Sequence, residues 1–158
     1  MGYVPFYSRL PKIAKRETRT VTILSKTPAG LPPGEYAFLE CFCDEPGCDC
    51  RRVFFCVVSP YSQDALAVIA YGWEDRKFYA RWFGSNDRRD LDDLRGPVLN
   101  LFSPQSKLAP AILEAFKQLL LPDTDYIDRV KQHYRLFRAS IDGESGTRAS
   151  GQRRRPRT

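Results

Sequence analysis

Residues 34–58 read GEYAFLECFCDEPGCDCRRVFFCVV, and this stretch decides the fold of the chain. Residues 34–43 and 51–58 each place aromatic and β-branched side chains in the two-residue period of a strand. Between them, DEPG at 44–47 is typical of a turn, because proline presets its own φ angle and glycine accepts a positive one. The stretch therefore predicts a β-hairpin.

Neighbouring segments extend this hairpin into a sheet. Further strands are expected at 20–24 (TVTIL), 64–74 (DALAVIAYGWE) and 77–84 (KFYARWFG). The links between successive strands after residue 34 are short, which favours an antiparallel meander of four to five strands. The polar segment that follows, up to Gly96, is expected to be a charged loop.

Two helices are expected after the sheet. Apolar residues recur at helical spacing in 107–121, and Pro122 ends that segment. Asp123 or Thr124 can cap a second helix over 124–139. The chain is thus predicted to be α+β, with the antiparallel meander and its metal-bound hairpin followed by two C-terminal helices.

The chain of 158 residues is expected to form one domain over 20–142. Residues 1–19 are expected to be a basic N-terminal arm, and 143–158 a disordered arginine-rich tail. The net charge of +6 comes from these two ends, since the region between them holds more acidic than basic residues.

Four of the five cysteines lie in the hairpin, at Cys41, Cys43, Cys48 and Cys50. Each of the two C-x-C pairs can aim both sulfurs at one point, because residues i and i+2 of a strand face the same way. Four thiolates around Zn²⁺ make a closed tetrahedral site of structural type. The spacing therefore predicts a zinc-bound hairpin.

Another ligand set includes His133, the only histidine of the chain. It lies on the predicted last helix and could replace Cys41 if that helix packs across the hairpin. With only three ligands the zinc would keep an open position, and a hydrolase would then need Glu40 or Asp49 as its base. A redox role is disfavoured because carboxylates beside the cysteines raise thiol pKa values.

The compartment follows from what the sequence lacks. No stretch approaches the roughly 20 apolar residues of a membrane span, and residues 1–16 do not have the pattern of a signal peptide. The protein is expected to be cytoplasmic and to have no contact with a membrane. Thiols stay reduced there and are available to a metal.

The basic ends suggest a nucleic-acid partner, because flexible cations bind phosphate backbones without reading sequence. The residues expected to do so are Lys12, Lys15, Arg16, Arg148, Arg153, Arg154, Arg155 and Arg157. A solubilising tail is the alternative for the C-terminal arginines. The aromatic residues of 71–83 are expected to lie on adjacent strands, where they form either core or the interface for a protein partner.

The segments CDEPGCDCRRV and YIDRVKQHYRLF resemble a set of small bacterial proteins of unknown function that pair a C-x-x-P-x-C-x-C hairpin with a late H-Y helix motif. The resemblance implies a metal site made from Cys43, Cys48 and Cys50 with His133 as fourth ligand, and it implies no activity.

Taken together, the sequence favours a non-enzymatic, zinc-stabilised protein that binds nucleic acid or a nucleoprotein complex through its basic ends. The alternatives are a zinc-stabilised subunit of a larger protein assembly and a zinc hydrolase.

Overall fold

A computed structural model describes residues 2–151, and it has the α+β class predicted from the sequence. The strands are β1 (Tyr3–Pro5), β2 (Arg19–Ile23), β3 (Gly34–Cys43), β4 (Arg52–Val58), β5 (Ala67–Gly72) and β6 (Val98–Leu99). The helices are α1 (Phe6–Arg9), α2 (Pro11–Glu17), α3 (Arg76–Phe83), α4 (Arg88–Arg95), α5 (Ala109–Ala115), the π-helix η1 (Phe116–Leu120) and α6 (Thr124–Gly151).

The sheet is antiparallel throughout and is built around β3. Strands β3, β4 and β5 form the predicted meander, and the short strand β6 extends it. The other side of β3 is shared, because β2 pairs with its first half and β1 with residues 41–43. The N-terminal strand therefore lies beside the cysteine end of β3.

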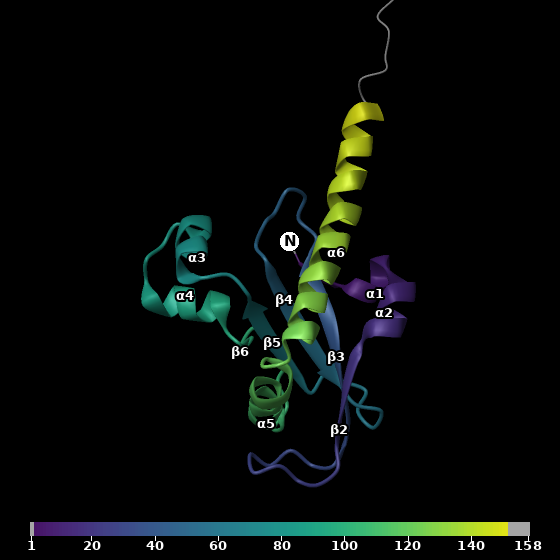
Figure 1. Cartoon of the computed structure of the whole chain (residues 1–158), viewed down its shortest axis with the longest axis vertical. Coiled ribbons are helices and arrows are strands. Elements are labelled where there is room, and N and C mark those ends of the chain that lie inside the picture. Colours follow the sequence, from purple (N-terminus) through teal and green to yellow (C-terminus); the bar gives the residue numbers. More distant parts are fainter. Residues whose placement is uncertain (1, 152–158) are drawn as a thin grey trace, which may run out of the picture.

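Helices α5 and α6 pack on one face of this sheet (Figure 1). Phe55 contacts Phe116 of η1 at a ring distance of 5.0 Å, and Phe42 contacts Phe137 of α6 at 5.5 Å. All four rings are fully buried. Burying one such side chain contributes roughly 1.5–3 kcal/mol, so these contacts fix η1 and α6 against the hairpin.

The first 19 residues are part of the domain, which corrects the prediction of an N-terminal arm. Phe6 is only 2% exposed, and Ala14 is also buried. The Phe6 ring stacks on the imidazole of His133 with 4.6 Å between ring centres. Contacts across more than 100 residues hold this segment, and a local pattern in the sequence does not reveal them.

The segment from 76 to 95 forms two helices where a strand and a loop were predicted. Asp75 caps α3 by accepting a hydrogen bond from the Phe78 amide, and Gly84 ends the helix in the left-handed conformation. Asp87 caps α4 in the same way through the Arg89 amide. These capping residues outweigh the strand preference of the aromatic residues in α3.

Helix α6 continues to Gly151, so the domain boundary expected at residue 142 falls inside a helix. Residues 153–157, with four of the arginines assigned to nucleic acid, lie outside the described residues. In the part of the chain that the structure describes, no helix combines the length and the apolar character needed to cross a membrane.

Candidate metal centre

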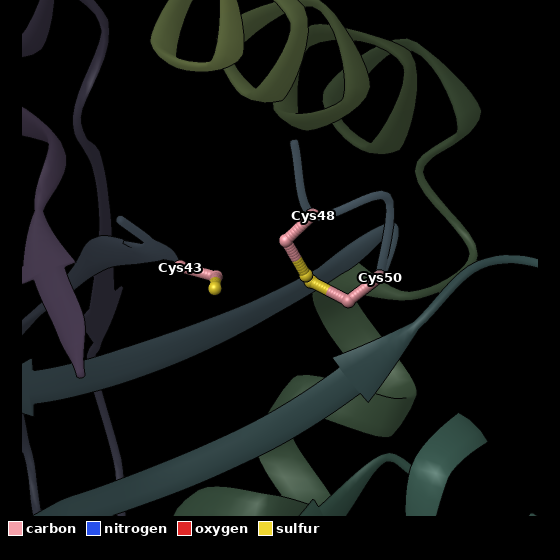
Figure 2. A group of neighbouring side chains, drawn as sticks. All are labelled: Cys43, Cys48 and Cys50. Atoms are coloured by element: carbon pink, nitrogen blue, oxygen red, sulfur yellow. The ribbon is translucent and has the colours of Figure 1, made fainter. Parts of the chain in front are cut away.

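Three cysteines of the hairpin come together in space. Cys43 ends β3, and Cys48 and Cys50 follow in the connection to β4; we call residues 43–50 the cysteine loop. The three Sγ atoms lie within 4.8 Å of one another, and Figure 2 shows the Cys43 side chain pointing toward the other two. Among residues 2–143, no other cysteine, histidine or carboxylate belongs to this group. The arrangement can hold a metal ion.

Helix α6 holds the cysteine loop through a buried arginine. Arg138 donates hydrogen bonds to the backbone oxygens of Cys43 at 2.5 Å and Glu45 at 2.6 Å. Its guanidinium also pairs with Asp142 at 3.1 Å, and Asp142 in turn accepts a hydrogen bond from the Gly47 amide at 2.9 Å. The loop that carries the sulfurs is therefore anchored to a helix from the far end of the chain.

The residue after Cys50 is held in an unusual conformation. Arg51 has a φ of +49°, in the left-handed region that residues with a side chain rarely adopt. Its amide donates to the hydroxyl of Tyr134 at 3.1 Å, and its carbonyl accepts from the hydroxyl of Tyr79 at 2.8 Å. Its guanidinium pairs with Asp49 at 2.9 Å. These contacts fix the direction in which the chain leaves Cys50.

The protein surroundings disfavour ionisation of the three thiols. Burial raises the pKa of Cys43, Cys48 and Cys50 above the ordinary thiol value. The guanidiniums of Arg138 and Arg52 lower the pKa of Cys43 and Cys50, but burial outweighs them. A metal ion would displace these protons, because only thiolates bind metals tightly.

Tyr3 lies at the edge of the cluster, on the strand that pairs with Cys43. Its ring stacks on Phe54 with 3.7 Å between centres, and its hydroxyl accepts a hydrogen bond from Arg52 at 3.3 Å. The same hydroxyl is next to the Cys50 thiol. Sequence patterns gave no indication of this residue, since β1 is three residues long and was not predicted.

Cys41, predicted as a ligand, is not part of the cluster. It occurs two residues before Cys43 on the same strand, but its thiol is close to Cys56 and Glu40. Burial, followed by these two neighbours, raises the pKa of Cys41 to about 12.

His133, the alternative ligand, is engaged elsewhere. It is 1% exposed and lies between two carboxylates, with Nδ1 at 2.8 Å from Glu40 and Nε2 at 3.2 Å from Glu17. Burial lowers the pKa of His133, but the two carboxylates outweigh burial and raise it above the ordinary value. The helix that was expected to reach the hairpin through this histidine reaches it through Arg138 instead.

The carboxylates considered as a hydrolytic base are also occupied. Glu40 is buried against His133, and Asp49 is paired with Arg51. Of the residues assigned to nucleic acid, Lys12, Lys15 and Arg16 are exposed on α2, and none of the three forms an ion pair with a described carboxylate. Arg148 falls within α6.

No family model, curated protein or solved structure matches this chain. The resemblance drawn from the hairpin and the late helix thus stays a prediction.

Proposed function

We propose that this is a zinc-binding protein in which Cys43, Cys48 and Cys50 hold one ion. The observation that supports the proposal is the convergence of three Sγ atoms within 4.8 Å. A set of sulfur ligands selects a soft or borderline ion, and tetrahedral sulfur sites in proteins most often hold zinc or iron–sulfur clusters. Zinc fits best, since three neighbouring thiolates on one short loop suit a single ion.

The proposed role of the ion is structural, in a reducing cytoplasm where the thiols remain available. It would tie the end of β3 to the start of β4 at the point where Arg138 anchors the cysteine loop to α6. Catalysis receives less support because the two carboxylates considered as bases, Glu40 and Asp49, are paired with other side chains.

The test is the zinc content of protein purified without added metal, measured by elemental analysis. We expect about one zinc per chain, lost in Cys43→Ser, Cys48→Ser and Cys50→Ser. Cys41→Ser and Cys56→Ser are the matched controls and should retain the ion. Absence of zinc from the wild type, with none taken up when zinc is offered, would refute the proposal.

A second candidate function is binding to nucleic acid or a nucleoprotein complex through α2. Its support is the exposed face formed by Lys12, Lys15 and Arg16, which are spaced so that they share one side of the helix. Phosphates would be their natural partners. A subunit that binds a protein partner remains the alternative.

Binding to a labelled duplex at several salt concentrations tests this candidate. Each lysine or arginine that contacts a phosphate adds about 0.9 to the slope of log affinity against log salt. Replacing all three α2 cations by alanine should lower the slope by roughly 2 to 3, whereas Lys77→Ala on α3 should leave it unchanged. Binding that is insensitive to both salt and the triple change would instead indicate an apolar protein interface.

A further inference from the structure

The cysteine cluster borders a cavity on the protein surface. This cavity, of about 210 Å³, is lined by the three cysteines together with Gly2, Tyr3, Glu45 and Trp82. A water molecule occupies roughly 30 Å³ of liquid volume, so the space exceeds what a single metal-bound water would need. Apolar atoms and two aromatic residues form most of its wall.

Three thiolates leave one position of a tetrahedral ion unfilled. The only histidine of the chain is buried between Glu17 and Glu40 and does not reach this position. Cys41 and Cys56 are outside the group as well. Glu45 is the one acidic residue among the described residues that line the cavity, and it is exposed and also lies outside the group.

The charges around the cluster favour a neutral ligand. A divalent ion bound by three thiolates has one net negative charge. Arg52 lies near Cys50 and forms no ion pair with a described carboxylate, so its guanidinium offsets that charge. An anionic fourth ligand would add an uncompensated charge to a partly buried site, which is unfavourable.

The shape and chemistry of the wall favour a flat ring. Trp82, at the end of α3, is 40% exposed and lines the cavity, as does Tyr3. Aromatic rings pack well against such side chains. Imidazole combines a flat aromatic ring, a neutral charge and a nitrogen donor that completes the Cys₃His set common in zinc sites.

We propose that the cavity beside Trp82 and Tyr3 binds an imidazole from outside the chain, which becomes the fourth ligand of the ion held by Cys43, Cys48 and Cys50. The inference rests on the proposed function, since it requires that the cluster binds a metal. The imidazole can belong to a small molecule or to a histidine of a partner protein.

The visible absorption spectrum of bound cobalt(II) changes when one of its ligands changes, so it can detect the fourth ligand directly. The 158-residue chain, without a histidine tag, is loaded with cobalt in the presence of a phosphine reductant. It is then titrated separately with imidazole, with a blocked Gly-His-Gly peptide, with 2-mercaptoethanol and with acetate. We expect a saturable spectral change with imidazole and with the peptide, at concentrations at least tenfold below those needed for the thiol or acetate. Tighter binding of the peptide would indicate a protein source, and equal binding a small molecule.

Substitutions in α3 test whether the ligand binds in the cavity. Trp82→Ala should weaken imidazole binding roughly threefold to tenfold, the effect expected for one lost aromatic contact, and Trp82→Phe should retain most of it. Phe83→Ala is the control, because Phe83 is 54% exposed on the same turn but does not line the cavity.

Two results would overturn the inference and one would overturn its premise. A cobalt-loaded protein whose spectrum does not respond to imidazole has no exchangeable fourth position. A preference for thiol or acetate would show that the ligand class is wrong. Failure to take up either cobalt or zinc would instead refute the proposed metal site.

Discussion

Replacing Arg138 by methionine should detach helix α6 from the cysteine loop. The residue is 8% exposed, and its positively charged guanidinium donates two short hydrogen bonds to backbone carbonyls. Bonds of this kind contribute roughly 1.5–3 kcal/mol each, and removing the donor leaves the acceptors of Cys43 and Glu45 without their partner. The pair with Asp142 adds at most about 0.5 kcal/mol, since that carboxylate is nearly half exposed.

The net decrease in the free energy of unfolding should be smaller than the sum of these contributions, because methionine keeps the apolar packing and the substitution removes a buried charge. We expect the free energy of unfolding to fall by about 2–4 kcal/mol. Zinc affinity should fall roughly tenfold or more, as for other partners that orient metal ligands.

Urea unfolding followed by circular dichroism, in the presence of a chelator, measures the first quantity. Arg135→Met is the control: this side chain is exposed one turn earlier on α6 and bonds only Gln132 among the described residues, so the change should have an effect below about 0.5 kcal/mol. The anchoring role would be refuted if Arg138→Met lowered the free energy of unfolding by less than about 1 kcal/mol, or by no more than the control does.

Two further changes test other parts of the fold. The pKa of His133 is higher in the folded protein than in the unfolded chain. The free energy of unfolding should therefore decrease as pH rises from about 6.5 through the raised pKa of His133. The raised pKa of Glu40 changes the free energy of unfolding in the same direction. A pKa raised by one unit contributes about 1.4 kcal/mol, and urea unfolding of metal-free protein at pH 6 to 8 should show a slope that changing both His133 and Glu40 to glutamine removes. Gly72→Ala should destabilise the protein by roughly 1–3 kcal/mol, because the added methyl group would overlap Tyr79. Gly143→Ala should raise the melting temperature, because alanine favours a helix more than glycine does and, among the described residues, no atom lies within 4 Å of the added methyl group; equal effects of the two glycine changes would contradict this packing.

The central hairpin was predictable because the sequence features that define it lie within the hairpin itself. Alternation over 34–58 and the Pro-Gly turn fix both strands and the position of the cysteines, whatever the rest of the chain does. Helix α3 was missed because aromatic residues favour strands in general, although Asp75 and Gly84 mark its two ends. Those capping residues were visible in the sequence and were a better guide than the composition of the segment.

The surroundings of the cysteine cluster were less predictable, for a physical reason. Arg138 bonds to backbone carbonyls, so no complementary side chain marks its target in the sequence. The same holds for the hydroxyls of Tyr79 and Tyr134, which bond to the backbone of Arg51. The four-cysteine prediction included Cys41 because alternation places it on the correct face, but the sulfurs that meet are those nearest the turn.

The cysteine loop also bears on the order in which the chain folds. Its three sulfurs come from one short segment, whereas the arginine that anchors it is 95 residues away from Cys43 in the sequence. Closing the short cysteine loop costs little chain entropy, whereas bringing the distant arginine to the loop costs more entropy and occurs later. An ion can thus be captured by the unfolded chain soon after the hairpin is synthesised, before α6 exists. Because such capture also stabilises the unfolded chain, added zinc should raise the equilibrium stability by less than the affinity of the native site implies.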